Sequence, residues 1–415
     1  MKIFKFGGGI IKDALSIQKL PEILEKYKDD KLVIVLSAID KTTNQLENLI
    51  NDYHYKKQKF IQSFIEIKQF HYNLASKLGL NEKYYLLRNL DSHFNQLFKN
   101  FQDYNSYPYD VLYDQVVSFG EVLSSTIVHY YLELKGFNVQ WLDGRILFKT
   151  NEKHRSACID ENLTFGLLNE EIQKSSANIF ITQGFIGSHS NNLLTTLGRE
   201  GSDYTAAVLG SVLKAEKVII WKDVAGVYNA DPKYYPPARL IPQMSYNQAA
   251  ELTGLGAKVL HHRTIQPLKD AGIPLEVKQY NAENISGSLI GKFSENDTLN
   301  IPVIIHRKNK ILFIVKANNG VKPNIDDIKL TIEKHQLEIN FVKEDKNQVV
   351  ICLNHLIEPA LALKEDFEKN YLLEILFGMM MVKVKNGNSE VFDEIKNDRK
   401  IVYEGCLDGV CYIFY

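Results

Sequence analysis

The chain has 415 residues, of which 45% are hydrophobic and 24% charged, and its formal net charge is −1. Such a length predicts two domains, because single cores rarely exceed ~250–300 residues. The near-neutral charge offers no general attraction for nucleic acid or an anionic membrane, so we expect small molecules, or copies of the chain itself, as partners. The start, MKIFKFGGG, lacks the apolar segment of an export signal, and no later apolar run approaches ~18 residues. We therefore predict a cytoplasmic protein.

Neither the four cysteines nor the adjacent pair His261–His262 shows a spacing typical of metal ligands. Cysteines this sparse, in a chain without an export signal, are expected to stay reduced. We therefore predict free thiols at Cys158, Cys352, Cys406 and Cys411.

Two strand–loop–helix units open the chain. Lys2–Phe6 is predicted as a strand, Gly7–Gly9 as a loop and about 13–28 as a helix. Leu32–Leu36 is a β-branched run typical of a buried parallel strand, and 37–43 then leads into helical sequence. Two such units predict a parallel sheet with helices on both faces.

The region from about 52 to 117 has apolar residues at three- and four-residue spacing, which predicts a helical excursion. Further strands are predicted at Phe137–Leu142, Ile179–Thr182 and Lys217–Trp221, and glycines and acids follow them. In open α/β sheets, ligands bind beyond the carboxyl ends of the strands. We therefore expect these loops to line one common site.

A domain boundary is predicted near Ser294–Pro302, between a first domain of residues 1–295 and a second of residues 300–415. Beyond it, the predicted order is strand, helix, strand, strand, helix, strand, which is the order of a ferredoxin-like unit. Those elements are predicted at 303–316, 324–336, 338–344, 347–353, 358–369 and 371–377. We further predict a strand at Met381–Val384, a helix near Glu390–Asn397 and a final strand at Val410–Phe414.

Three early segments carry residues suited to a small anionic substrate. Lys5 ends a strand beside glycines whose amides can approach an oxyanion, although glycines there also make plain turns. After the second strand, the hydroxyls and amides of 37–44 can hold a carboxylate, but Thr42 or Thr43 can equally cap the helix. Glu121 can bind an ammonium group, or it is an ordinary first-turn acid favoured by the helix dipole.

The later segments are richer in charged groups. In Thr196–Ala207, Arg199 can fork onto a carboxylate and Asp203 can orient a lysine or a metal–nucleotide. The alternative is that these two residues form a structural salt bridge with each other. Two further segments, Trp221–Lys233 and Gly254–His261, supply an acid, an aromatic surface and lysines suited to a nucleotide.

In chain order, these segments resemble those of the aspartate kinases, in the amino-acid kinase superfamily, over roughly residues 1–292. The shared pattern comprises KFGG, a serine-alanine loop ending in Lys-Thr-Thr, a Gly-Glu with paired serines, GRxGSDYTAA, DVxGVYxADP and GAKVLH. The resemblance implies an α/β amino-acid kinase fold, with a mostly parallel central sheet, followed by a ferredoxin-like ACT region. It also implies that, with Mg²⁺, the γ-phosphoryl group of ATP is transferred to the β-carboxylate of L-aspartate to give 4-phospho-L-aspartate. That product opens the lysine, threonine and methionine branch.

Carried over residue by residue, the resemblance implies a role for each matching position. Lys5 and Asp203 would be catalytic, with Asp203 organising the lysines, and Gly7, Gly8 and Gly9 would bind phosphate. The aspartate-binding residues would be Ser37, Thr43, Glu121, Arg199 and Ser202, with Arg199 on the α-carboxylate and Glu121 on the ammonium. The nucleotide-binding residues would be Lys222, Asp223, Tyr228, Lys233 and Lys258. No protein side chain is expected to ligate the metal directly.

Three positions depart from the family pattern. Gly9 stands where a threonine or serine is common, which removes a hydroxyl near the phosphates. Lys222 replaces a threonine and adds a cation, while His262 replaces a proline and is expected to alter only a loop. None of these changes removes a charged group assigned to the reaction.

The region 300–415 has room for one complete ACT-like unit and part of another. In this family such regions bind lysine or threonine and help to form dimers, so the resemblance implies such an effector and a homodimer. Feedback control is a hypothesis at this point. Two alternatives stay open: a kinase for another amino-acid carboxylate, such as glutamate or acetylglutamate, and a catalytically silent amino-acid sensor, which Gly9 favours.

Overall fold

The computed structural model describes residues 1–55, 57–257, 259–282, 286–294, 301–345, 347–354, 356–397 and 399–415. The chain forms two compact units, Met1–Val227 with Leu240–Thr298, and Tyr228–Arg239 with Leu299–Tyr415. The predicted boundary near Ser294–Pro302 contains residues 295–300, which lie outside the described residues. Across the described ranges, no helix has both the length and the apolar character needed to cross a membrane.

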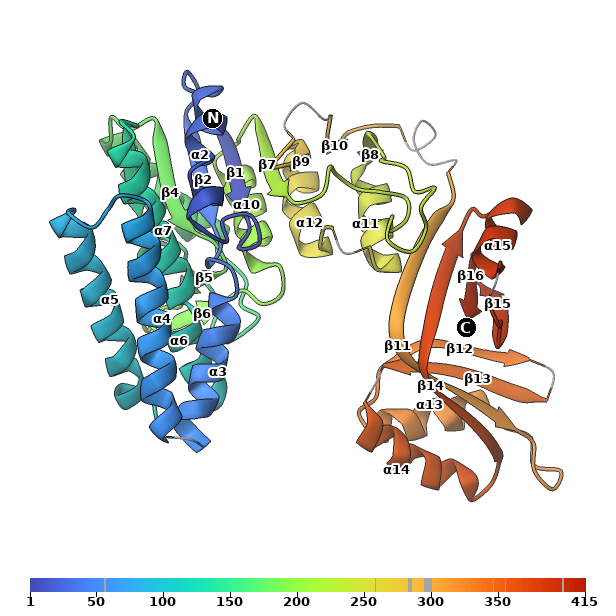
Figure 1. The fold of residues 1–415 in the computed structure, drawn as a ribbon. Helices are drawn as coiled ribbons and strands as arrows, with labels where there is room; N and C mark the ends of the chain where they lie inside the picture. Colours follow the sequence, from blue (N-terminus) through green and yellow to red (C-terminus); the bar gives the residue numbers. More distant parts are fainter. Residues whose placement is uncertain are drawn as a thin grey trace. The chain divides into compact units, whose positions relative to one another are not determined.

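An eight-stranded sheet organises the first unit (Figure 1). Its strands are β1 (Lys2–Phe6), β2 (Leu32–Leu36), β3 (Val139–Leu142), β4 (Ile179–Gln183), β7 (Lys217–Lys222), β8 (Gln243–Ser245), β9 (Leu275–Gln279) and β10 (Ser288–Gly291). They lie in the order β3-β4-β2-β1-β7-β9-β10-β8, with β3 to β9 parallel and β10 antiparallel to β9. The predicted mostly parallel sheet is confirmed. Strand β2 has its predicted bounds because all five of its residues are buried, as a central parallel strand requires.

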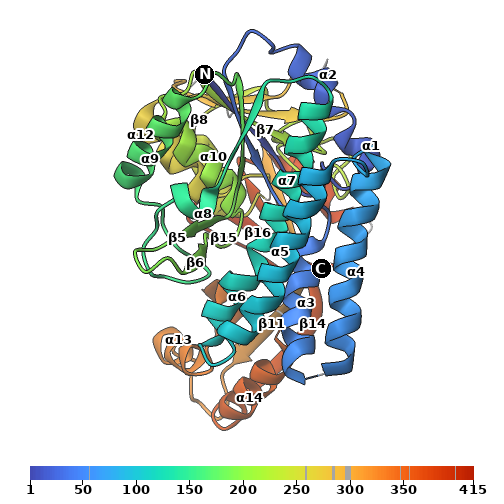
Figure 2. The same ribbon diagram turned by 90° about the vertical axis from the view of Figure 1, so that its left-hand side faces the viewer.

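Helices cover both faces of this sheet (Figure 2). One apolar cluster joins Phe4 and Phe6 of β1 to α1 (Ala14–Ile17), α2 (Leu20–Glu25), α3 (Thr42–Tyr55), α4 (Lys57–Lys77), α5 (Tyr84–Asp103), α6 (Tyr109–Val117) and α7 (Phe119–Leu134). The remaining elements of this unit are α8 (Gly144–Leu147), α9 (Glu161–Lys174), β5 (Ile186–Ser188), β6 (Leu194–Thr196), α10 (Gly201–Val212), α11 (Tyr246–Leu255) and α12 (His262–Ala271). Successive side chains of a strand point to opposite faces, so Lys5 points away from the cluster and reaches α10, where it meets Asp203.

The single helix predicted over about 13–28 is wrong, because α1 and α2 occupy this stretch as two short helices. Asp13 caps α1 by accepting a hydrogen bond from the Ser16 amide at 2.7 Å. Pro21 lies in the first turn of α2, where its missing N–H costs nothing, whereas inside one continuous helix it would break the hydrogen-bond ladder.

The second unit contains an antiparallel sheet in the order β12-β13-β11-β14-β16-β15. Its elements are β11 (Val303–Lys316), α13 (Ile325–Lys334), β12 (Ile339–Asp345), β13 (Gln348–Asn354), α14 (Ile357–Glu368), β14 (Leu372–Lys385), α15 (Ser389–Lys396), β15 (Tyr403–Leu407) and β16 (Val410–Phe414). The first six follow the predicted β-α-β-β-α-β order. The separate strands predicted at 371–377 and 381–384 are wrong, because β14 continues through both. Gly378 (φ +70°) absorbs a register shift against β11, so pairing resumes beyond it.

The prediction of four free thiols is wrong for two of them, because Cys406 and Cys411 form a disulfide. These residues lie directly opposite each other on β15 and β16. Strand β15 was not predicted, so the sequence offered no reason to place its cysteine against β16. Cys158 and Cys352 are free.

Candidate active site

A cavity of about 400 Å³ lies at the carboxyl ends of β1 and β2. Six of the predicted site residues line it: Lys5, Ser37, Thr43, Glu121, Arg199 and Ser202. A larger cavity of about 590 Å³ lies beside the edge strand β3, but it contains none of the predicted residues. The smaller cavity is therefore the candidate site, at the sheet edge where open α/β folds bind their ligands.

Two lysines and one aspartate form a buried charged cluster beside the cavity. Lys5 Nζ lies 2.6 Å from Asp203 Oδ1, and Lys222 Nζ lies 2.9 Å from Asp203 Oδ2. Burial by itself would raise the pKa of Asp203, but the charges of the two lysines outweigh it and hold that pKa at about 2. The two lysines outnumber Asp203, although Glu200, 3.8 Å from Lys222 Nζ, adds a second negative charge. The cluster lies next to the N-terminus of α10, and lysines in that position are suited to a phosphate group. Its geometry excludes the alternative in which Asp203 pairs with Arg199.

Glu121 lies in the first turn of α7 and is almost fully buried. Its Oε1 accepts a hydrogen bond from the Ala38 amide at 3.2 Å, whereas Oε2 has no hydrogen-bond partner among the described residues. Burial raises the pKa of Glu121 to about 8, although the Ala38 amide opposes this shift. A buried carboxylate oxygen without a partner at a cavity wall is suited to receive an ammonium group.

The loop after β2 presents a hydroxyl and a helix start to the cavity. The Thr42 hydroxyl donates to the Ile39 carbonyl at 2.7 Å and is fully buried, so Thr42 serves the loop itself. Thr43, one residue later at the start of α3, lines the cavity. The Ser37 carbonyl accepts a hydrogen bond from Ser124 Oγ at 2.8 Å, which ties this loop to α7.

The three glycines after β1 differ in how much space surrounds them. A Cβ added at Gly8 would lie 2.3 Å from the Ala38 carbonyl oxygen, and one at Gly7 would lie 3.1 Å from Lys5 Nζ. A Cβ added at Gly9 would meet no heavy atom within 4 Å among the described residues. Gly8 is thus required by close packing, while the position of Gly9 has room for a side chain.

The predicted nucleotide residues are divided between different parts of the chain. Lys222 belongs to the charged cluster, and Asp223 is exposed directly after β7. Tyr228 and Lys233 belong to the other compact unit, and Lys258 lies outside the described residues.

His262, where the family pattern has proline, is the first residue of α12. The first helical position is one that proline also favours, so this exchange preserves the helix start.

Seven further residues line the cavity without having been predicted as site residues: Tyr113, Arg155, Phe185, Thr196, Gly198, Glu200 and Gly201. Tyr113 lies within α6, inside the long helical region, where nothing in the sequence separates a cavity-facing aromatic residue from a core one. Arg155 lies in a polar stretch between β3 and α9 that matches no motif. The sequence did give a signal for Thr196, Gly198, Glu200 and Gly201, since they belong to the segment that contains Arg199.

Comparisons with known proteins agree with this fold. The model of the "Amino acid kinase family" matches residues 1–279. The chain is 29% identical over 322 residues to the lysine-sensitive aspartokinase 3 of Escherichia coli (strain K12), a match covering 73% of this chain and 72% of that protein. It is 31% identical over 277 residues to the bifunctional aspartokinase/homoserine dehydrogenase 2 of the same organism, which covers 67% of this chain but only 34% of that protein.

Among solved structures, that of E. coli aspartokinase III in complex with lysine and aspartate aligns with a TM-score of 0.81 at 24% identity, covering 100% of this chain and 96% of the other. The aspartate kinase of Clostridium acetobutylicum aligns with a TM-score of 0.77, also at 24% identity, covering 100% and 96%. At this identity the alignments establish the fold. The relatives by sequence confirm the resemblance to aspartokinases. Because the family model matches more than half of its length, the chain belongs to the amino acid kinase family.

Proposed function

We propose that this protein is an aspartate kinase, which transfers the γ-phosphoryl group of ATP to the β-carboxylate of L-aspartate and forms 4-phospho-L-aspartate. This product would supply the branch that leads to lysine, threonine and methionine. The observation that carries the proposal is one cavity that combines an arginine, a carboxylate oxygen with no hydrogen-bond partner in the described part of the chain, and a buried lysine cluster. An amino acid with a second carboxylate presents the three complementary groups.

Two protein groups of opposite charge would hold the α-carboxylate and the ammonium group of the acceptor. Arg199 would bind the α-carboxylate through paired hydrogen bonds, and Glu121 Oε2 would accept from the ammonium. Ser37, Thr43 and Ser202 supply hydroxyls along the same cavity. These contacts direct the β-carboxylate toward Lys5. A carboxylate is already ionised at neutral pH, so it attacks the phosphoryl group without a general base.

The buried cluster would stabilise the negative charge of the phosphoryl group during transfer. Lys5 and Lys222 would neutralise negative charge on the phosphate oxygens, while Asp203 fixes both ammonium groups before the substrate arrives. The close-packed Gly8 keeps the loop after β1 near the phosphates. Mg²⁺ bound with ATP would supply further charge neutralisation. Asp223, Tyr228, Lys233 and Lys258 complete the proposed nucleotide set.

We assign the catalytic domain to residues 1–295 and an ACT-like regulatory and dimerisation region to residues 300–415. The ferredoxin-like order of β11 to β14 supports this, as does the lysine sensitivity in the name of the E. coli relative. Lysine or threonine would then inhibit the kinase, and the working form would be a homodimer. Kinase activity measured with millimolar lysine, threonine and both together tests the regulation, and unchanged rates would contradict it.

The reaction is tested by trapping the acyl phosphate with hydroxylamine. Purified protein would be incubated with Mg·ATP and L-aspartate, L-glutamate, N-acetyl-L-glutamate or no acceptor. We expect hydroxamate with L-aspartate alone. Product with another acceptor would identify a different member of the family. If folded protein binds ATP but forms no product with any acceptor, the alternative of a catalytically silent amino-acid sensor would be favoured.

A further inference from the structure

Arg155 lines the same cavity as Arg199, although it belongs to no motif of the sequence. A Cβ added at Gly198 would lie 2.8 Å from the Arg155 carbonyl oxygen, so the backbone of Arg155 packs directly against the residue that precedes Arg199. Two arginines thus come from neighbouring loops. The side chain of Arg155 is 44% exposed and that of Lys5 only 6%, which places Arg155 at the mouth of the cavity and Lys5 at its floor.

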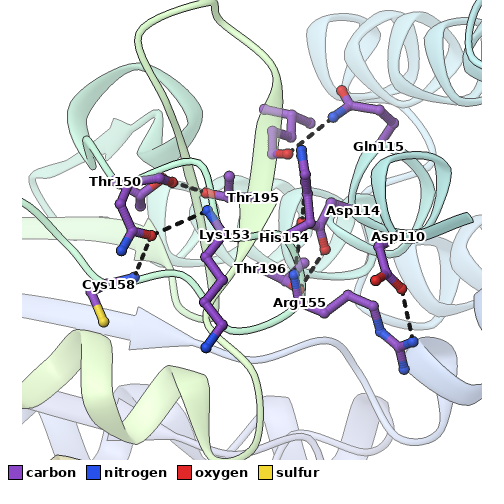
Figure 3. A network of polar contacts seen from close by, with 12 residues as sticks. Asp110, Asp114, Gln115, Thr150, Lys153, His154, Arg155, Cys158, Thr195 and Thr196 are labelled. Carbon is purple, nitrogen blue, oxygen red and sulfur yellow. Dashed lines mark hydrogen bonds and ion pairs between the residues drawn. The ribbon is translucent and has the colours of Figure 1, made fainter. Parts of the chain in front are cut away.

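The backbone of Arg155 is held in place by a buried aspartate (Figure 3). Asp114 of α6 is fully buried, and its Oδ2 accepts from the Arg155 amide at 3.1 Å and lies 2.7 Å from His154 Nδ1. Its Oδ1 accepts from the Thr196 hydroxyl at 2.6 Å. Arg155 has φ +59°, a left-handed conformation that non-glycine residues adopt at a cost. Asp114 therefore maintains a strained loop, as is common where a side chain must be aimed at a ligand.

The guanidinium of Arg155 is oriented but only weakly engaged. Its Cζ lies 4.5 Å from the ring centroid of Tyr113, and Nη1 donates to Asp110 Oδ1 at 3.0 Å. Asp110 is more than half exposed, and exposed ion pairs of this kind contribute little. Of the five N–H donors of the guanidinium, one has an acceptor among the described residues. The contact with the Tyr113 ring restricts the position of the guanidinium while its remaining donors stay available for a carboxylate.

We propose that Arg155 is a specificity-determining residue, which binds the α-carboxylate of the acceptor together with Arg199 and is held by Asp110 while the cavity is empty. The inference rests on the proposed function. Because the β-carboxylate must lie at the floor beside Lys5, the arginines at the mouth receive the other carboxylate. The ligand class is then an amino acid that carries both a free α-carboxylate and a side-chain carboxylate.

The test compares Arg155→Met with the wild type. We expect the KM for L-aspartate to rise about 10- to 100-fold, the range for losing a hydrogen bond to a charged group, with kcat changed less than about twofold. Arg88→Met removes the same charge from α5, away from this cavity, and should leave both parameters unchanged. Asp110→Asn should lower the KM in the wild type and have no effect in the Arg155→Met background, because only Arg155 links Asp110 to the acceptor.

The ligand supplies the matching chemical control. L-aspartate α-amide keeps the ammonium and the β-carboxylate but lacks the anionic α-carboxylate. Arg155→Met should weaken calorimetric binding of L-aspartate at least about tenfold and that of the α-amide less than about twofold. Equal losses for both ligands, or no loss for L-aspartate in a variant with an unchanged melting temperature, would overturn the proposal. Because calorimetry requires no turnover, this result is separate from failure of the proposed reaction, which would appear as an inactive wild type.

Discussion

Affinity for L-aspartate should increase with pH between 6 and 8, because the proposed partner of its ammonium group is protonated in the empty cavity. Burial raises the pKa of Glu121 to about 8. The ionised fraction of Glu121 is then ~1% at pH 6, ~10% at pH 7 and ~50% at pH 8. If only the carboxylate form binds, the apparent Kd equals the intrinsic Kd divided by this fraction, and it should fall roughly 50-fold from pH 6 to pH 8.

Isothermal titration calorimetry measures both consequences. At pH 7, binding should release ~0.9 proton, seen as a dependence of the observed enthalpy on the ionisation enthalpy of the buffer. Glu121→Gln is the control, since it keeps the shape of the side chain without its titration. The variant should bind weakly, with a flat pH profile and no proton release. A flat profile in the wild type, with no proton released, would refute the assignment of Glu121 to the ammonium.

The same shift has a consequence for stability, with the opposite sign. A carboxyl group whose folded pKa lies above its ordinary value of 4.5 holds its proton more tightly in the folded state. The empty protein should therefore lose the contribution of Glu121 as the pH rises from ~4.5 to ~8. Added L-aspartate should raise the melting temperature more at pH 8 than at pH 6, because there it binds more tightly.

Four substitutions test the rest of the site by steady-state kinetics. Lys5→Ala should lower kcat about 10²- to 10³-fold without unfolding the protein. A near-normal rate would contradict the proposed position of the phosphoryl group beside Lys5. Arg199→Ala should chiefly raise the KM for L-aspartate. An unchanged KM would mean that another residue binds the α-carboxylate. Lys222→Thr leaves Asp203 with one lysine partner and removes one of the two cations proposed to contact the phosphates, so it should raise the KM for ATP about tenfold. An unaltered KM would assign Lys222 a purely structural role. Gly9→Thr should raise kcat and change stability by less than ~0.5 kcal/mol, since a Cβ there meets no heavy atom of the described residues within 4 Å; a lowered melting temperature would contradict that geometry.

The sequence by itself determined the fold class and six of the thirteen residues that line the cavity. Buried parallel strands can be recognised by short runs of β-branched residues, so both ends of the strand Leu32–Leu36 could be predicted correctly. Loops after such strands meet at one sheet edge whatever the details of packing. That rule, together with the family motifs, explains how residues as distant in the chain as Lys5 and Ser202 could be assigned to one site in advance.

Tertiary structure alone decided which charges pair and which polar residues reach the cavity. Lys222 could be placed beside Lys5, with Asp203 between them, only once β7 was seen to lie beside β1, more than 200 residues away in the chain. Arg155 reaches the mouth because a buried Asp114 holds its loop, and Cys406 meets Cys411 because an unpredicted strand pairs with β16. These contacts join residues through the packing of separate elements, so they depend on distances across the fold that local periodicity and motif spacing do not encode.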